Sequence, residues 1–406
     1  MPVSISQNAI TKAPQTANNT PDYLDTATAL ARSLGETAVE RDKAGGVARK
    51  ELEQIRDSGL LKLIIPREYG GDGQPWSAAL RVVREFAKAD GSLAHLYGYH
   101  FLNLTIAQLE GSDAQFAELC RRTAAERLFW GNANNSLDDR LRGARQPDGT
   151  YLLNGVKGFT SGAAYADLLL ISFRDEQNPD RVQRAVIPAN RAGVTIHDDW
   201  DCIGQRQTAS GTVSFTDVEV RPEELLLNDR QASPFSTIGP ILAQLILTSV
   251  FIGSSQGAVA AASEYTRTQS RPWITSGVSR ASEDRLVIRH YGEIGIHLEA
   301  AISLADKAAA KFDEAFAKGF SLTAEERGEV AYITAAANVF SGNTALDTTS
   351  RVFEAMGARS TASKYGFDRF WRNVRTHTLH NPAEYKIQTV GNYILNGQLP
   401  KPGFYS

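Results

Sequence analysis

Sulfur-containing residues are scarce in this 406-residue chain, which has two cysteines and two methionines. Cys120 and Cys202 cannot by themselves build a disulfide framework or a cysteine-rich zinc site, and such low cysteine use is typical of a reducing compartment. An excess of positive charge is also missing, because 43 Lys and Arg face 46 Asp and Glu for a net charge of −3. This balance argues against a nucleic-acid-binding surface.

Long apolar runs and targeting signals are missing as well. The sequence has no stretch of about 18 uninterrupted apolar residues, the length that a bilayer span requires. Residues 1–22 are polar, contain no arginine and show no charged region that leads into an apolar one, so they match neither a secretory signal nor a transit peptide. We expect a disordered tail over residues 1–22 and a cytoplasmic location.

What the chain does contain is an ordinary globular composition, with 42% hydrophobic and 22% charged residues. Its length suggests two or three domains, at roughly 150 residues each. At the start of the chain the apolar residues recur at three- and four-residue steps, as in Leu24, Ala27, Leu30 and Leu34, a spacing that predicts helices. We expect an N-terminal helical domain over residues 23–127.

The middle of the chain, residues 128–232, changes to short β-rich runs such as LLLIS and TVSF. Asp148-Gly149 and Asn154-Gly155 stand between apolar runs and are typical of hairpin turns. Short strands at a spacing of about ten residues predict a small β-barrel or sandwich.

The last part, residues 233–406, returns to helical patterns. Residues 240–268 are apolar on most faces, and residues 282–318 and 323–356 are long amphipathic runs. Long antiparallel helices with short connections form a four-helix bundle, which we expect here together with a C-terminal tail. The helix–strand–helix order predicts an α+β protein of three domains. The most apolar helix needs more covering than one small domain provides, which predicts oligomerisation.

Common phosphate-binding and metalloprotease motifs are absent, because the sequence has no GxGxxG, no GxxxxGK[ST] and no HExxH. Ser161 does not lie in a GxSxG turn, so a serine hydrolase has little support. His377 and His380 lie three residues apart, a spacing that could present two metal ligands on one helix face. Since no Asp, Glu or Cys nearby in the sequence completes such a site, we expect no metal.

Four segments resemble signatures of the acyl-CoA dehydrogenase fold. Residues 59–71 (GLLKLIIPREYGG) are similar to its helix-to-loop signature, and residues 151–167 (YLLNGVKGFTSGAAYAD) are similar to its first middle-domain hairpin. GQRQT from Gly204 and FTDVEV from Phe215 are similar to its closing strands. The segments follow the family's order, and the resemblance runs from about residue 25 to the end. It implies a helical domain, a central β domain and a C-terminal four-helix bundle.

Within this fold, three further segments resemble the flavin-dependent monooxygenases related to dibenzothiophene monooxygenase. They are residues 89–100 (ADGSLAHLYGYH), 265–273 (YTRTQSRPW) and 365–380 (YGFDRFWRNVRTHTLH). The resemblance implies a homotetramer that uses O2 and FMNH2, the latter from a separate NAD(P)H:flavin reductase. It also implies that a flavin C4a-(hydro)peroxide oxygenates a planar, largely apolar heteroaromatic or organosulfur substrate of the dibenzothiophene or indole type.

The choice between dehydrogenase and oxygenase depends on one position near the C-terminus. A dehydrogenase of this fold must remove an α-proton from a thioester, and many members use the Glu of a segment resembling RDxRxxxIxEGT. Here residues 372–382 read RNVRTHTLHNP, with Asn381 in place of that Glu. An amide cannot accept a proton near neutral pH, so the sequence favours the oxygenase.

Two alternatives stay open at this stage. Between Pro240 and Arg271 the only acid is Glu264, and some members of the family place the base on this long helix. An FAD-dependent acyl-CoA dehydrogenase with Glu264 as its base is therefore the first alternative. The second is a non-catalytic flavoprotein that keeps the same fold.

An oxygenase gives His380 a role, because an imidazole with an ordinary pKa of about 6.5 can donate or accept a proton near neutral pH. Ser161 could donate a hydrogen bond to the peroxide or to the flavin N5 region. The resemblance implies that His95, Tyr99 and Asn132 also face the flavin. The alternatives are a loop hydrogen bond for His380, a turn position for Ser161, and an ordinary core pair for His95 and Tyr99.

The phosphate of FMN is assigned to Arg271, because a guanidinium fork suits phosphate oxygens. The resemblance implies that this arginine comes from a neighbouring subunit, and the alternative is a helix-end cap before Pro272. Thr160 and Arg359 are further candidate flavin contacts.

Overall fold

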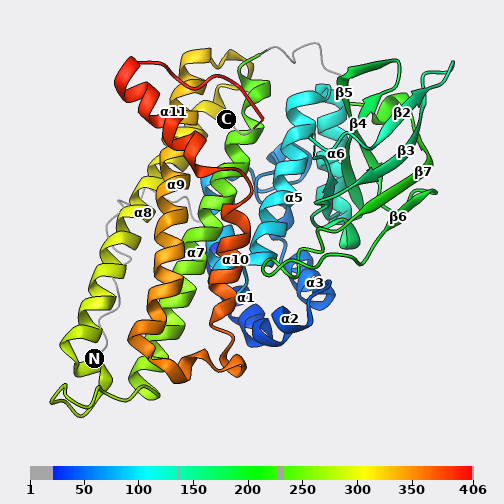
Figure 1. Cartoon of the computed structure of the whole chain (residues 1–406). Coiled ribbons are helices and arrows are strands. Elements are labelled where there is room, and N and C mark those ends of the chain that lie inside the picture. Colours follow the sequence, from blue (N-terminus) through cyan, green and yellow to red (C-terminus); the bar gives the residue numbers. More distant parts are fainter. Residues whose placement is uncertain (1–21, 136, 227–232, 405–406) are drawn as a thin grey trace.

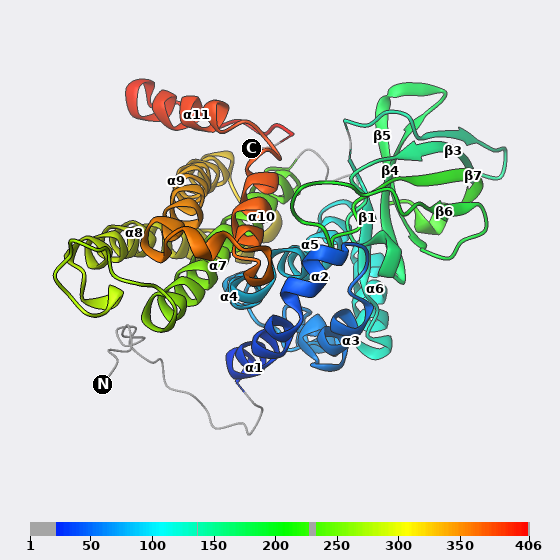
Figure 2. The ribbon, with the colours of Figure 1, turned by 60° about the horizontal axis from the view of Figure 1, so that its bottom comes forward.

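The computed structural model describes residues 22–135, 137–226 and 233–404. The tail predicted over residues 1–22 therefore lies outside the described residues, except for Asp22. Helices precede a β domain and a second set of helices follows it, as the sequence predicts (Figure 1). Figure 2 shows the C-terminal helices and the β domain on opposite sides of the molecule, with the N-terminal helices beside both.

The N-terminal helices form a core around α4 and α5. The described helices here are α1 (Tyr23–Glu36), α2 (Ala38–Ala44), α3 (Arg49–Asp57), α4 (Trp76–Ala89), α5 (Gly91–Glu110) and α6 (Asp113–Glu126). Aromatic rings join α4 to α5 edge to face, at 6.2 Å between Trp76 and Phe101 and 5.1 Å between Phe86 and Tyr97. Such contacts between buried rings add to their apolar burial and fix the crossing of the two helices.

The β domain is one curled sheet of seven strands, confirming the predicted central β domain. The strands are β1 (Trp130–Ala133), β2 (Arg142–Arg145), β3 (Tyr151–Lys157), β4 (Leu168–Asp175), β5 (Asn178–Pro188), β6 (Val194–Ile196) and β7 (Val213–Val220). The strand order is β1-β4-β2-β3-β7-β6, and β5 pairs with β4. Leu153, Ile171, Phe173 and Phe215 are buried together in the core of this sheet.

One of the two predicted hairpin turns is wrong. Asp148-Gly149 does join β2 to β3, which pair antiparallel. Asn154-Gly155 instead lies inside β3, where the register to β7 shifts. The Asn154 amide exchanges hydrogen bonds with Asp217 across the strands, at 2.9 and 3.0 Å, and this pairing supports a bulge. Gly155 has a φ of +129°, and a Cβ there would lie 2.1 Å from a backbone oxygen, so this position requires glycine.

The C-terminal part is a helical bundle, as predicted. Its described helices are α7 (Gly239–Thr268), α8 (Arg285–Ala317), α9 (Ala324–Met356), α10 (Asp368–Thr378) and α11 (Ala383–Asn396). α7 packs against α4, α5, α8 and α9. By length and composition α7 could cross a membrane, but 78% of its apolar window is buried inside the protein, which is the pattern of a core helix.

Two helices bring the three parts of the molecule together. α5 lies between the bundle and the sheet (Figure 1), and it contacts β1 on one side and α7 on the other. α10 runs along α7 and α9 and also touches α5. The junction of the three parts is therefore lined by α5, α10 and loops of the β domain, which carry the histidines and hydroxyls described next.

Candidate active site

His95 is held at the start of α5. The Asp90 carboxylate caps this helix by accepting hydrogen bonds from the backbone amides of Ser92 and Leu93, at 2.9 and 3.2 Å. Arg41 in turn binds Asp90 at 2.6 Å. His95 lies on the next turn and is only 5% exposed. The cap and the ion pair therefore fix where its imidazole meets the β domain.

Ser161 lies on the loop after β3, and backbone hydrogen bonds hold this loop on two sides. The amide of Asn132 in β1 donates to the Ser161 carbonyl at 3.1 Å, and the amide of Gly162 donates to the Thr208 carbonyl, also at 3.1 Å. The Thr160 hydroxyl donates to the Gly211 carbonyl at 2.8 Å. The loop is thus a rigid support for the Ser161 hydroxyl.

A chain of hydroxyl groups connects Ser161 to the backbone. Thr208 Oγ1 donates to the Gln205 carbonyl at 2.8 Å, and Ser210 Oγ donates to Thr208 Oγ1 at 2.7 Å. Ser161 Oγ lies 2.7 Å from Ser210 Oγ. A hydroxyl has one proton, and Ser210 has already used its own. Ser161 must therefore donate to Ser210.

This chain assigns the tautomer of His95. His95 Nε2 lies 3.1 Å from Ser161 Oγ, and the Ser161 proton is committed to Ser210. His95 Nε2 must then carry the proton and donate it, which leaves Nδ1 as a bare acceptor. Nδ1 is buried and has no hydrogen-bond partner within the described residues. In this arrangement Ser161 can donate a hydrogen bond to a flavin only after it gives up its hydrogen bond to Ser210.

Two more rings pack on the His95 imidazole. The ring centroid of Tyr99 lies 4.0 Å away and that of His377, on α10, lies 4.6 Å away. Burial lowers the pKa of His95 to about 3 and that of His377 well below its ordinary value. Both imidazoles are therefore neutral at pH 7, because burial disfavours the charged form.

His380 completes a cluster of three histidines. It follows α10, and its electrostatic effect lowers the pKa of both His95 and His377. His380 is exposed to solvent, although protein surrounds much of its imidazole. Burial, and after it the charge of Lys386, lowers the pKa of His380. A hydrogen bond with Asn381 raises that pKa, by a smaller amount. His380 is thus the one histidine of the cluster that has both solvent access and protein contacts for proton exchange.

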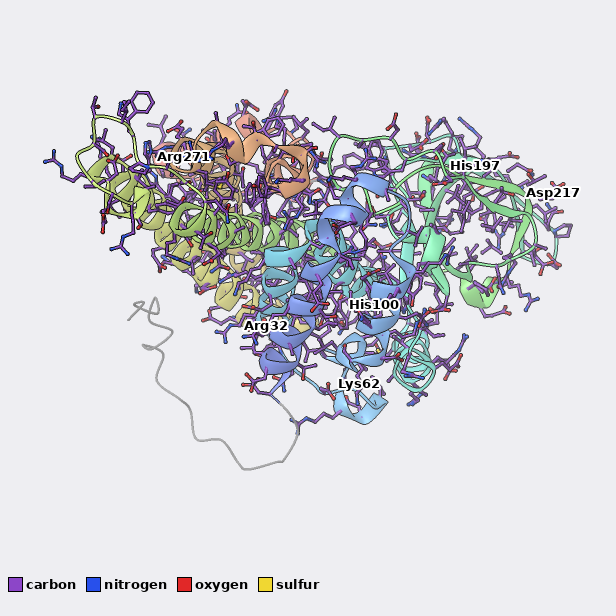
Figure 3. The ribbon with its side chains drawn as sticks, turned by 90° about the horizontal axis from the view of Figure 1, so that it is seen from below. Arg32, Lys62, His100, His197, Asp217 and Arg271 are labelled. Carbon is purple, nitrogen blue, oxygen red and sulfur yellow. The ribbon has the colours of Figure 1, made fainter. Side chains whose placement is uncertain are left out.

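The predicted site residues fall into two groups. His95, Tyr99, Ser161, Asn132, Thr160 and His380 lie around the junction of α5, α10 and the β domain. Arg271 and Arg359 lie at another end of the bundle, where Arg359 donates to the Gln269 carbonyl at 3.3 Å. Figure 3 shows Arg271 across the molecule from His197 and Asp217 of the β domain. One subunit therefore does not bring the two arginines to its own histidines, and all eight assignments stay predictions.

The two acid-base positions of the dehydrogenase alternative are not suited to that reaction. Asn381, at the position of the expected base, is buried. Glu264 is 64% exposed and pairs with Arg267 at 2.8 Å. At about 1.5 Å per residue, it lies about 20 Å along α7 from Phe251, which borders a cavity beside His377. The structure thus gives Glu264 no access to the histidine cluster.

The polar atoms around the junction fit a flavin. His95 Nδ1, His377 Nδ1 and Gln205 Oε1 are buried without a hydrogen-bond partner in the described part of the chain, and native proteins rarely leave such atoms unpaired. An isoalloxazine offers both donors and acceptors along one edge. Within the same described ranges, no group of three or more His, Cys, Asp or Glu could hold a metal ion.

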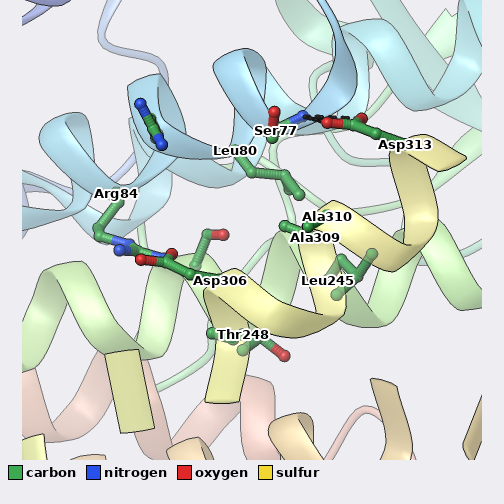
Figure 4. Close-up of a pocket in the computed structure, with 12 residues that line it drawn as sticks. Ser77, Leu80, Arg84, Leu245, Thr248, Asp306, Ala309, Ala310 and Asp313 are labelled. Atoms are coloured by element: carbon green, nitrogen blue, oxygen red, sulfur yellow. Dashed lines mark hydrogen bonds and ion pairs between the residues drawn. The ribbon is translucent and has the colours of Figure 1, made fainter. Parts of the chain in front are cut away.

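Two cavities lie near the bundle. A cavity of about 120 Å³ lies between α4, α7 and α8, where the Arg84–Asp306 ion pair and the Ser77–Asp313 hydrogen bond line it (Figure 4). None of the predicted site residues borders it. A smaller cavity of about 30 Å³ lies beside His377 and is also lined by Asn338, Asn381 and Lys386.

Sequence reasoning missed several residues of this site. The spacing of His377 from His380 predicts only a possible pair of metal ligands, although the same spacing places both residues close together. Thr208 ends the GQRQT segment and Ser210 follows it, but their hydroxyl chain depends on contacts between distant loops. Lys386 gave no signal at all, because a lysine in an amphipathic helix is most often exposed.

The chain matches family models along most of its length. The N-terminal domain of acyl-CoA dehydrogenases matches residues 23–127, the middle domain matches residues 137–218, and the C-terminal domain matches residues 245–384.

Individual relatives are similar over nearly the whole chain. A dibenzothiophene monooxygenase of Mycolicibacterium goodii is 47% identical, over 95% of this chain and 96% of that protein. A probable FMNH2-dependent monooxygenase, SfnC of Pseudomonas putida, is 43% identical, over 96% of this chain and 99% of that protein. The crystal structure of TdsC from Paenibacillus sp. A11-2 with FMN and indole is 42% identical, with a TM-score of 0.91 over 94% of this chain and 99% of that one.

Proposed function

Because this chain belongs to the acyl-CoA dehydrogenase-fold flavin monooxygenases related to dibenzothiophene monooxygenase, we propose that it oxygenates a planar, largely apolar heteroaromatic or organosulfur compound with FMNH2 and O2. FMN is bound beside indole in the similar TdsC structure, and SfnC is named as FMNH2-dependent. FMNH2 has to be regenerated, so a separate NAD(P)H:flavin reductase is the protein partner.

The observation that carries this proposal is the chemistry of the junction. It presents three histidines and a hydroxyl chain, and Asn381 replaces the carboxylate that a dehydrogenase of this fold needs. Neutral imidazoles donate and accept hydrogen bonds and can exchange a proton, but they are not the carboxylate base that removal of an α-proton uses in this fold. Reduced FMN supplies the reaction with O2, and the chain's own residues position groups around it.

The histidines take different roles in this proposal. His95 has a pKa of about 3, so near pH 7 it stays neutral, with its one ring proton on Nε2, and acts as an acceptor through Nδ1. His380 is exposed to solvent and exchanges a proton with the reacting groups. Tyr99 and His377 pack against His95 and keep water away from it. Exclusion of water strengthens the polar contacts that His95 makes.

In this proposal Arg271 of a neighbouring subunit in a homotetramer holds the phosphate of FMN, and Arg359 is a further flavin contact. Arg271 lies in an exposed loop after α7, next to Trp273 and Ile274, which are 73% and 89% exposed. Large apolar side chains at such exposure are typical of a surface that another subunit covers. This arrangement would bring the two arginines to a histidine cluster that they cannot reach within one subunit. We place the enzyme in the cytoplasm.

The experiment supplies FMN, NADH, a flavin reductase and air, with dibenzothiophene or indole as substrate. We expect an oxygenated product that depends on each component. Omission of the reductase should abolish the product, and chemically reduced FMN should restore it. The contradicting result is bleaching of bound FAD by an acyl-CoA without any oxygenation.

A further inference from the structure

α11 is attached to the bundle by a lysine. Lys386 is the only buried residue of this helix, at 8% exposure, whereas the neighbouring Tyr385 and Ile387 are exposed. An amphipathic helix usually docks through apolar side chains. Here an ammonium group makes the buried attachment, beside a ring contact of Tyr393 with Tyr332 of α9 at 4.5 Å between centroids. The position of α11 therefore depends in part on the partners of that ammonium group.

The partners of Lys386 form an ordered network across three helices. Lys386 Nζ donates to Gln244 Oε1 at 2.7 Å and to Asn338 Oδ1. Asn338 Nδ2 donates to the Gln244 carbonyl at 3.1 Å and to Thr248 Oγ1 at 3.2 Å. Because the amide nitrogen of Asn338 is used on α7, its oxygen must face Lys386. The network therefore joins α11 to both α7 and α9.

All these partners are neutral. Among the residues that the structure describes, no carboxylate pairs with Lys386, and its recorded partners are amide oxygens. Burial lowers the pKa of Lys386 to about 8, so the side chain still carries its charge at pH 7. A buried cation without a counter-ion acts strongly on its surroundings, since little solvent screens it.

The surroundings of Lys386 include the histidines of the site. Lys386, His377 and Asn381 line the same small cavity. The His380 amide donates to the His377 carbonyl at 3.0 Å and closes the turn after α10. Only four residues separate Asn381 from Lys386, so an anchor on α11 also fixes this turn.

The charge of Lys386 reaches His380. Beside burial, two groups act on the pKa of His380, Asn381 on the same turn and Lys386. Asn381 is an amide, and the nearby imidazoles of His95 on α5 and His377 on α10 are neutral. Lys386 on α11 is the charged group of this set. Its field opposes a second positive charge nearby.

We propose that Lys386 is a positioning residue for the histidine cluster, because its buried ammonium anchors the turn that carries His380 and places a positive charge at the cavity that His377 and Asn381 line. This charge favours the neutral form of the His380 imidazole. A neutral His380 is ready to take a proton at neutral pH, which suits its role in oxygenation. The proposal rests on the proposed function for this consequence, but its structural and electrostatic content does not depend on catalysis.

The test is a titration of His380 by NMR in flavin-free protein labelled with ¹³C at the histidine rings. The His380 signal is identified by its loss in His380→Gln. We expect Lys386→Met to raise the pKa of His380 by about half a unit or more, and Lys386→Arg, which keeps the charge, to leave it near the wild-type value. The acid limb of the oxygenation pH profile should move upward with it.

Two further variants separate charge from anchoring. Asn338→Asp places a carboxylate beside Lys386, so the lysine stays docked while its field is offset, and the pKa of His380 should again rise. Lys311→Met removes an exposed lysine of α8 that pairs with Glu314 and should change nothing. An unchanged His380 titration in both Lys386→Met and Asn338→Asp would overturn the proposal. Since the titration needs no turnover, it stands or fails separately from the proposed function.

Discussion

His95 Nε2 and Ser161 Oγ lie 3.1 Å apart, and the proton between them belongs to His95. The assignment follows from two hydrogen bonds in series: Ser210 donates to Thr208, and Thr208 donates to the Gln205 carbonyl. The result is a neutral imidazole of fixed tautomer whose second nitrogen is a bare acceptor at the junction of α5, α10 and the β domain. The hydroxyl chain thus sets what His95 can offer to a cofactor.

Removal of Ser210 should release this tautomer. In Ser210→Ala the Ser161 hydroxyl can donate its proton to His95. The ¹⁵N spectra of His95 should then show a mixture of the two neutral tautomers, with the proton on Nδ1 or on Nε2, in place of the Nε2-protonated form alone. Loss of one hydrogen bond costs about 1 kcal/mol, and the oxygenation rate should fall about fivefold. Ser214→Ala is the matched control, because Ser214 binds His197 in the same sheet at 2.6 Å. Unchanged ¹⁵N shifts in Ser210→Ala would contradict the assignment.

The proton exchange assigned to His380 predicts a large effect of its removal. His380→Phe keeps a ring of similar size but no titrating nitrogen, and oxygenation should fall about 100-fold or more. NADH consumption by the reductase should continue. His197→Phe changes an exposed histidine of the β domain and should keep full activity. Near wild-type oxygenation by His380→Phe would show that the proposed role is wrong.

The buried histidines should make the fold sensitive to mild acid. The pKa of His95 is about 3 in the folded chain and about 6.5 in the unfolded chain. Below pH 6.5 the unfolded chain therefore binds a proton that the folded chain does not, and the free energy of unfolding falls as the pH falls. The contribution is fully present above pH 6.5 and decreases toward pH 3, by about 1.4 kcal/mol per unit.

Urea unfolding of wild type and His95→Gln between pH 7 and 5 measures this contribution, because carboxylates titrate little in that range. The free energy of unfolding should fall less steeply in His95→Gln. Parallel curves for the two proteins would mean that His95 is not held neutral by burial.

The placement of Arg271 on a neighbouring subunit predicts complementation. Arg271→Ala should weaken FMN binding, and His380→Phe should block turnover. A mixed oligomer of the two contains some sites with an intact Arg271 from one chain and an intact His380 from the other. Refolding of a one-to-one mixture should restore about a quarter of wild-type activity if chains pair at random. No recovery above the separate variants would place both residues in one subunit's site.

The order of the domains and much of the junction could be predicted from the sequence. Helical periodicity and short β-rich runs predict the order of the domains, because each is a local pattern. The resemblance of the segments around His95, Ser161 and His380 to a known family predicts that these residues share a site. Asn154-Gly155 was misread as a turn, since the Asn154–Asp217 pair that makes it a bulge joins residues 63 positions apart.

The rest of the site depends on contacts that no local pattern contains. The hydroxyl chain from Ser161 through Ser210 and the stacking of His377 on His95 arise only when α5, α10 and two loops meet. Lys386 is the clearest case, because its burial follows from neutral partners on α7 and α9. Sequence predicts which residues carry the chemistry, and tertiary structure decides their protonation and tautomer.

The central claim is that this chain transfers an atom of molecular oxygen to its substrate. Its most direct test mixes the protein with chemically reduced FMN, dibenzothiophene or indole, and ¹⁸O2, and measures the mass of the product. We predict a mass increase of about 2 Da for each oxygen added, relative to the product made with ordinary O2, and none when the label is supplied as H2¹⁸O. Product that carries oxygen from water, or no oxygenated product beside reduction of FAD by an acyl-CoA, would contradict the account.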